Sequence, residues 1–298
     1  MDTQQFLRDL QSDNPDTRFA AWRQAGTAPA AVIPQLGKIA ASQDPGVAKA
    51  GREALATIVH SVGKDPMTAN RAAAVKGLLD LTGSDNTPAV RVHAMRLLSN
   101  IAGEESVPAI GKQLSNPELR EEAAFTLERI GGGAVVKAFM AAYRDSKDDF
   151  RPRILAALGH LRAAEATELV TEAMRSPNKD VALAAARAFG RTGRKPAGQI
   201  PAVALTGTWD QIEYADSQLR YADGRAKDGD TAEAMRVYRT MLDRPEEHLQ
   251  CAAIIGIAKL NTAEAASAIM PKLKSSNSKV RITAATAWKG MAAARSGT

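Results

Sequence analysis

Residues 208–225, TWDQIEYADSQLRYADGR, gather side chains that could handle a nucleic-acid base. Aromatic rings stack on bases, and Trp209, Tyr214 and Tyr221 supply three rings close to the carboxylate of Asp210. Tyr214 and Tyr221 lie seven residues apart, so they share one face of a helix. Two rings that fill the core of an irregular repeat would have the same spacing, and we favour that interpretation. A base-stacking site is the alternative.

Residue types that build metal, cofactor or nucleophile sites are sparse. The four histidines are dispersed, and none is followed by glutamate. Cys251 is the only cysteine, which excludes an internal disulfide and a cysteine-based zinc site. The sequence contains neither a phosphate-binding glycine loop nor a Gly-x-Ser-x-Gly motif. We therefore expect no catalytic residue, no metal and no cofactor.

One helical outline recurs along the 298 residues. Aligned by their first apolar position, the copies begin at Val47, Val90, Leu119, Phe150, Val181, Leu249 and Val280, and a shorter first copy has Thr17 at this place. The steps are 30, 43, 29, 31, 31, 68 and 31 residues, which is the period of a solenoid of stacked units. The step of 43 predicts an insertion near SVGKDPMTANR, and the step of 68 predicts a degenerate copy near DQIEYADSQLRYADG, residues 210–224.

Each unit is predicted to hold two helices, because a second amphipathic stretch precedes every copy. Asp, Asn, Ser and Pro at the junctions suit helix starts, and Gly103, Gly131 and Gly193 suit left-handed helix ends. One column of the second helix holds mostly small residues, which lets neighbouring helices approach closely. Its members are Gly51, Ala94, Ala123, Ile154, Ala185, Ala253 and Ala284. An arginine recurs one residue after the first apolar position, as in Arg18, Arg91 and Arg281, where it could reach the acidic turn of the next unit.

The pattern Asp/Asn-Pro-x-Val/Leu-Arg-x-x-Ala-Ala-x-x-Leu-x-x-Ile-Gly resembles the HEAT-like repeat of about 31 residues, in the short bacterial form also found in phycobiliprotein lyases. The resemblance covers residues 3–193 and 230–292. It implies an all-α fold, a right-handed α-solenoid of about eight or nine stacked HEAT-like helix pairs. We divide the chain into HEAT-like repeats at 1–193, an irregular segment with a degenerate repeat at 194–229, and further HEAT-like repeats at 230–298.

The resemblance favours a non-catalytic scaffold that binds a partner protein along the concave face of the second helices. HEAT-like alkylpurine DNA glycosylases instead use aromatic side chains and a carboxylate in a basic cleft. A nucleic-acid-binding protein, in its most specific form such a glycosylase, is therefore the alternative. Its site would consist of Trp209, Asp210, Tyr214 and Tyr221. Nothing in the sequence identifies residues for chromophore transfer, so a lyase activity is a minor alternative.

The candidate protein-binding residues come from positions predicted to face solvent on the second helices. Basic groups recur there in register, and Phe125 and Ile255 are apolar residues predicted to be exposed. An exposed apolar side chain beside arginine is typical of protein contact sites. The full set is Arg96, Phe125, Arg129, His160, Arg187, Arg191, Ile255 and Lys259. The alternative is that basic residues at helix ends only compensate the helix dipole.

The net charge of +6 is unevenly distributed. Residues 1–149 hold 17 Lys/Arg and 18 Asp/Glu, whereas residues 150–298 hold 22 and 15. The basic second half predicts a partner with an acidic surface, with nucleic acid as the alternative. The sequence has no secretory signal and no apolar run of membrane-spanning length, so we expect no membrane insertion and a cytoplasmic protein.

Overall fold

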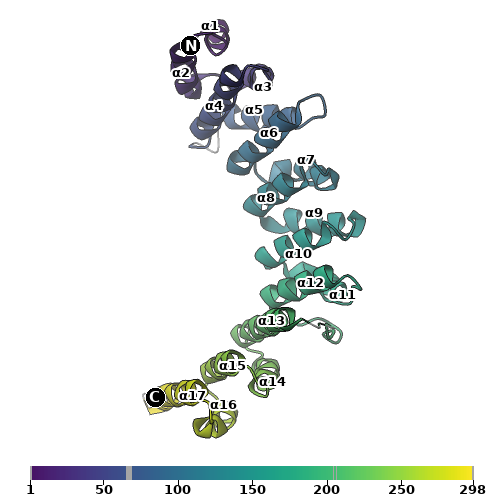
Figure 1. Ribbon diagram of the computed structural model, residues 1–298, viewed down its shortest axis with the longest axis vertical. Helices are drawn as coiled ribbons and strands as arrows, with labels where there is room; N and C mark the ends of the chain where they lie inside the picture. Colours follow the sequence, from purple (N-terminus) through teal and green to yellow (C-terminus); the bar gives the residue numbers. More distant parts are fainter. Residues whose placement is uncertain (1, 65–68, 204, 206, 297–298) are drawn as a thin grey trace. The chain divides into compact units, whose positions relative to one another are not determined.

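The structure is a computed structural model that describes residues 2–64, 69–203, 205 and 207–296, with side chains to residue 291. These residues form helices and connecting segments without any strand (Figure 1). The predicted all-α architecture of stacked helix pairs is therefore confirmed. The insertion predicted near residues 61–71 includes residues 65–68, which lie outside the described residues. No described helix is both long enough and apolar enough to cross a membrane.

The chain divides into two compact units, unit 1 (residues 1–145) and unit 2 (residues 146–298). The helices of unit 1 are α1 (Thr3–Asp9), α2 (Pro15–Arg23), α3 (Ile33–Ala40), α4 (Pro45–Val62), α5 (Ala69–Leu81), α6 (Pro88–Ile101), α7 (Val107–Lys112), α8 (Arg120–Ile130) and α9 (Gly132–Asp145). Helices α2, α4, α6 and α8 pack side by side in chain order and carry the repeated pattern. We call them the second helices of unit 1.

The helices of unit 2 are α10 (Arg151–His160), α11 (Thr167–Ala173), α12 (Lys179–Thr192), α13 (Thr208–Lys227), α14 (Thr231–Leu242), α15 (Glu247–Leu260), α16 (Ala263–Ile269) and α17 (Ser278–Ser296). Its second helices are α10, α12, α13, α15 and α17, which pack in that order (Figure 1). The two units together hold nine second helices in the described chain, which agrees with the predicted eight or nine repeats.

Short polar side chains begin the second helices at the predicted junctions. The Asp44 carboxylate accepts a hydrogen bond of 2.8 Å from the Val47 amide, and Asn178 accepts one of 3.0 Å from the Asp180 amide. Gly131 and Gly193 follow α8 and α12 with positive φ values of 68° and 63°, as predicted. The prediction is wrong for Gly103, whose φ is −124°, because α6 ends in an extended residue instead.

The column of small residues lies in the core, as predicted. All seven members are buried, and Ala94, Ala123 and Ala185 are completely inaccessible to solvent. At Gly51 a Cβ atom would lie 2.6 Å from the backbone nitrogen of Ala40, so α3 and α4 approach at backbone distance. Small side chains thus replace the aromatic groups that usually fill a core of this size.

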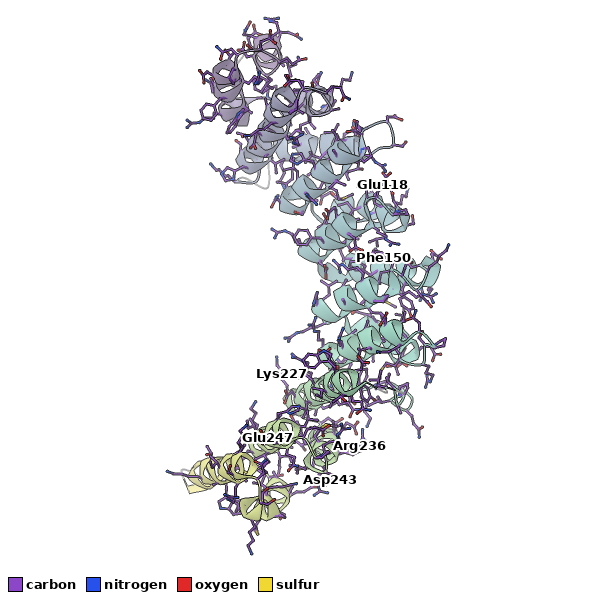
Figure 2. All side chains as sticks on the ribbon, in the orientation of Figure 1. Glu118, Phe150, Lys227, Arg236, Asp243 and Glu247 are labelled. Atoms are coloured by element: carbon purple, nitrogen blue, oxygen red, sulfur yellow. The ribbon has the colours of Figure 1, made fainter. Side chains whose placement is uncertain are left out.

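The repeated arginine has two roles. Arg91 forms an ion pair with Glu118 in the turn before α8, as predicted. Arg18 and Arg281 instead donate to carbonyls of the turn before their own helix, at 2.6 Å to Ser12 and 2.6 Å to Ser275. The bridge to the next repeat is therefore wrong for these two. In unit 2 a lysine makes a comparable link, since Lys279 lies 2.5 Å from Glu247 at the start of α15 (Figure 2).

The degenerate copy in unit 2 consists of a second helix without a first. Helix α13 fills the position between α12 and α15, but residues 194–203 before it are irregular in place of a helix. Pro196 and Pro201 lack the amide proton that a helix interior needs, and Gly198 adds backbone freedom. Residues of this segment and of α13 together line a pocket.

Candidate binding grooves between second helices

A groove lies between α10 and α12 in unit 2, with a volume of about 610 Å³. Its lining includes His160 at the end of α10 and Arg187 and Arg191 on α12. Three of the predicted protein-binding residues are therefore neighbours on one surface. Ala156, Ala184 and Ala188 form its floor, because small residues keep the two helices close and leave the long side chains at the rim.

The α10–α12 groove also contains acidic groups. Arg187 donates from Nε to the Glu213 carboxylate at 2.5 Å, and Asp180 and Asp210 line the groove. Asp210 forms an ion pair of 2.5 Å with Lys179, which raises the pKa of that lysine. Arg191 is exposed, and no ion pair to it is found among the described residues. The free positive charge of this groove is therefore centred on Arg191.

A second groove, of about 680 Å³, lies between α15 and α17. Ile255 on α15 and Ile282 on α17 line it, and their side chains are 49% and 66% exposed. Ala258, Ala287 and Gly290 add small apolar residues to its lining. Among the described residues of the lining, Lys259 alone is charged. Two of the predicted binding residues, Ile255 and Lys259, thus share an apolar groove.

The two grooves occupy equivalent places in the repeat. His160, Arg191 and Lys259 all lie ten residues after the first apolar position of their copies, and Arg187 and Ile255 lie six residues after it. His160, Arg187 and Arg191 line the α10–α12 groove. Ile255 and Lys259 line the α15–α17 groove at the same places in the repeat. The chain therefore presents one repeated surface whose chemistry changes from cationic to apolar along unit 2.

The other three predicted residues lie on unit 1. Arg96 on α6 donates from Nε to the Glu122 carboxylate of α8 at 2.8 Å. Phe125 on α8 is 48% exposed, and the guanidinium carbon of Arg129 lies 6.0 Å from its ring centroid. Arg129 also donates to the Ser99 carbonyl at 2.8 Å. An aromatic ring and a cation therefore form one exposed pair on α8.

The position of the basic groups within their helices bears on the alternative that they only compensate the helix dipole. Arg129, His160, Arg191 and Lys259 each lie in the last turn of their helices. A cation there is stabilised by the helix dipole without any ligand. The exposed side chains of Phe125, Ile255 and Ile282 have no such explanation. The apolar residues, rather than the cations, distinguish a binding surface from a solvated one.

The four residues proposed for base stacking do not converge on one cleft. Trp209 is 71% exposed at the start of α13, and Asp210 lines the α10–α12 groove in its ion pair with Lys179. Tyr214 and Tyr221 line a different pocket. Tyr221 is buried and stacked on Phe189 with ring centroids 4.7 Å apart, as expected for a core ring.

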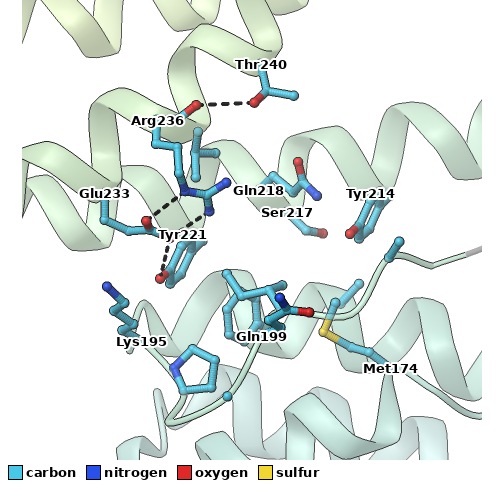
Figure 3. A pocket seen from close by; sticks show the side chains of 17 residues that line it. Met174, Lys195, Gln199, Tyr214, Ser217, Gln218, Tyr221, Glu233, Arg236 and Thr240 are labelled. Atoms are coloured by element: carbon cyan, nitrogen blue, oxygen red, sulfur yellow. Dashed lines mark hydrogen bonds and ion pairs between the residues drawn. The ribbon is translucent and has the colours of Figure 1, made fainter.

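That pocket, of about 490 Å³, lies between residues 195–202, α13 and α14 (Figure 3). Arg236 donates to both oxygens of Glu233 at 2.8 Å, and the Tyr221 hydroxyl donates to the same carboxylate at 3.2 Å. The guanidinium of Arg236 lowers the pKa of Glu233. Burial, followed by the charge of Glu233, raises the pKa of Tyr221. Tyr214 donates to the Pro201 carbonyl at 3.2 Å, and burial raises its pKa.

Sequence reasoning missed several residues of these sites. Ile282 and the members Lys195, Glu233 and Arg236 of the α13–α14 pocket were not predicted. Ile282 had no distinguishing signal, because Phe19, Val92 and Leu183 are apolar at the same place in other copies, two residues after the first apolar position. Glu233 and Arg236 had none, because their pairing at i and i+3 is common on solvated helices. Among the described residues, no three His, Cys, Asp or Glu side chains lie close enough to hold a metal ion.

Comparison with known proteins connects the repeat to a family. A family model described as HEAT repeats matches residues 75–157. No curated protein matches the chain. A crystal structure of an engineered protein is similar over 98% of this chain and 89% of its own, with 23% identity and a TM-score of 0.42. A crystal structure of a Kap121p mutant is similar over 95% of this chain and 32% of its own, with 14% identity and a TM-score of 0.43. The family match confirms HEAT repeats over residues 75–157, whereas the phycobiliprotein-lyase subtype stays a prediction.

Proposed function

We propose that this HEAT-like repeat protein is a non-catalytic scaffold that binds an acidic protein partner on the exposed face of its second helices. The distribution of exposed large apolar side chains carries the proposal. Six such residues occur in the described chain, and five of them lie on second helices, whereas Met270 does not. The five are Phe19, Phe125, Trp209, Ile255 and Ile282.

Cations accompany the apolar residues of this face. Arg23 lies 5.5 Å from the ring centroid of Phe19, Arg129 lies 6.0 Å from that of Phe125, and Lys259 shares a groove with Ile255. Aromatic or apolar anchors next to arginine are enriched where proteins contribute most of their binding energy. The excess charge lies in unit 2, which holds 23 Lys/Arg and 17 Asp/Glu, whereas unit 1 holds 16 of each. This charge favours an acidic partner.

Nucleic-acid binding is the second candidate, and the charge of unit 2 is the observation that favours it. A phosphate backbone would bind the cations of the α10–α12 groove and leave the apolar α15–α17 groove unused. Such binding weakens steeply as the salt concentration rises, because the release of counterions from the phosphates then becomes less favourable, whereas contacts of Ile255 and Ile282 depend little on salt. The two candidates therefore differ in salt dependence and in the residues on which they rely.

The test is affinity capture from a lysate of the source organism, with and without nuclease, using the wild-type chain and three variants. Ile255→Glu and Ile282→Glu place a charge in the α15–α17 groove. Met270→Glu is the matched control, because Met270 is 52% exposed but lies outside the second helices. We expect a stoichiometric, nuclease-resistant partner that the wild type and Met270→Glu retain and that both groove variants lose.

Two outcomes would count against the scaffold proposal. Recovery of nucleic acid, with every protein partner lost on nuclease treatment, would support the second candidate. Equal retention of a partner by all four chains would remove the α15–α17 groove, with Ile255 and Ile282, from its binding site. Circular dichroism of each variant checks that the substitution leaves the helices intact.

A further inference from the structure

The repeat built on α13 is incomplete, since it lacks a first helix. In the following repeats, α14 packs on α15 and α16 packs on α17. Before α13, the chain instead passes through residues 194–203 without helical structure. The side chains of Tyr214, Ser217, Gln218 and Tyr221 form one face of α13 at helical spacing, and all four line the α13–α14 pocket. The pocket therefore lies where a first helix would otherwise cover α13.

The walls of this pocket are largely apolar. Phe189 and Met174 contribute from the preceding repeat, Val237 from α14, and Ile200 from the irregular segment. The rings of Tyr214 and Tyr221 complete the lining. Its volume of about 490 Å³ falls within the range of sites that enclose small organic molecules, roughly 300–1,000 Å³. A rigid helical frame on three sides and aromatic walls suit a ligand with a planar or branched apolar body.

The charged groups of the pocket lie toward one end. Figure 3 shows Lys195, Glu233 and Arg236 on one side and Tyr214 and Met174 on the other. Arg236 balances the charge of Glu233 and donates hydrogen bonds to both of its oxygens. The Tyr221 hydroxyl donates a further hydrogen bond to the same carboxylate. The Arg236 pair uses Nε and Nη2, so its Nη1 group is available. No ion pair to Lys195 is found among the described residues, and its ammonium adds a positive charge at the mouth.

The balance of charge selects the ligand. Two cations and one carboxylate give this end a net positive charge, and the carboxylate has its hydrogen bonds from within the protein. An incoming cation would have to displace Arg236 from Glu233. An incoming anion would meet the Lys195 ammonium and a free guanidinium group at no such cost. A carboxylate is the common small anion that accepts from both groups while it carries an apolar body.

We propose that the α13–α14 pocket binds a small organic carboxylate whose planar or branched apolar body lies between Tyr214, Phe189 and Met174 and whose carboxylate faces Lys195 and Arg236. The site is independent of the protein-binding face, because none of its described lining residues also lines either groove. The irregular segment then has a role, since a first helix at this place would fill the site.

The test compares indole-3-acetate with its neutral amide, indole-3-acetamide, by isothermal titration calorimetry and saturation-transfer NMR. We expect indole-3-acetate to bind with a Kd below about 1 mM and the amide to bind at least about tenfold more weakly. Lys195→Gln should weaken the carboxylate about three- to tenfold and leave the amide unchanged. Ala202→Trp, at an exposed position of the lining, should block both compounds.

The matched control is Lys227→Gln. Lys227 lies at the end of α13 and does not line the pocket (Figure 2). Its substitution by glutamine removes the same charge as Lys195→Gln does. This variant should bind indole-3-acetate as the wild type does. Equal binding of acid and amide, an equal effect of Lys195→Gln and Lys227→Gln, or no binding of indole-3-acetate below about 1 mM would each overturn the proposal. None of these results depends on whether the second helices bind a protein.

Discussion

Arg225 of α13 donates from Nε to the carbonyl oxygen of Gly193, at 2.7 Å, and so links α13 to the end of α12. Arg225 is a buried residue that also pairs with Asp228. Gly193 has a φ of 63°, and its left-handed conformation directs the chain into the irregular segment. The Arg225 side chain therefore stabilises the junction at which the regular repeat is interrupted.

Arg225→Met should lower the free energy of unfolding by about 2 kcal/mol. The variant keeps most of the apolar stem but leaves the Gly193 carbonyl without its donor, and an unsatisfied buried acceptor costs roughly 1–3 kcal/mol. Urea denaturation followed by circular dichroism measures the change. Arg220→Met is the control, since Arg220 and Asp216 form an exposed pair for which we expect a change within about 0.5 kcal/mol. Equal effects of both variants would contradict a structural role for the Arg225 link.

Gly190→Ala should destabilise the chain, although alanine is the better helix former. A Cβ atom at residue 190 would lie 2.3 Å from the carbonyl oxygen of Ser217, which belongs to the backbone of α13. Separation of the two helices should cost about 1–3 kcal/mol, more than the gain of up to about 1 kcal/mol from helix propensity. Gly133→Ala, where a Cβ meets no atom within 4 Å, should instead be neutral or stabilising. Thermal unfolding of the two variants gives the comparison.

Two buried tyrosines should make the fold sensitive to alkali. Burial, followed by a hydrogen bond of 2.6 Å to Asp223, raises the pKa of Tyr238, and burial likewise raises the pKa of Tyr221. A raised folded-state pKa favours the folded chain below the unfolded value of about 10, and this contribution is lost as the pH rises toward the folded value. The free energy of unfolding should therefore fall above about pH 10, by up to about 1.4 kcal/mol per pH unit for each group.

Tyr238→Phe isolates one of these groups. The variant should show a shallower loss of stability between about pH 10 and pH 11 than the wild type. Denaturation in urea at both pH values measures the slope, and tyrosinate absorbance reports when the hydroxyls ionise. A wild-type chain in which all four tyrosines ionise near pH 10 without unfolding would contradict the raised pKa values.

The cation of Arg191 should contribute to partner binding beyond its effect on the helix dipole. Arg191 and Lys227 both lie in the last turn of a helix, but only Arg191 lines the α10–α12 groove. Arg191→Gln and Lys227→Gln should each cost roughly 0.3–1 kcal/mol of stability. Only Arg191→Gln should weaken the captured partner, by about tenfold for a lost charge-assisted contact. If affinity is unchanged in both variants, dipole compensation accounts for Arg191.

Most of the helical framework could be predicted because its signals are local. Asp44 and Asn178 begin helices by accepting hydrogen bonds from amides within three residues. The burial of Ala94 and Ala123 could be predicted from the helical periodicity alone. The exposure of Phe125 and Ile255 followed from the same register. Gly103 was predicted wrongly, since the conformation of a residue between helices depends on the chain that follows.

The sequence by itself determined the repeat, the faces of its helices and the types of side chain on each face, since these depend on periodicity within one helix. Only the tertiary structure decided which side chains meet. Asp210 joins Lys179 rather than Tyr214, and Ile255 joins Ile282, because each pair comes from different second helices. The α13–α14 pocket likewise depends on packing between repeats. Contacts between helices depend on distances that no single period encodes.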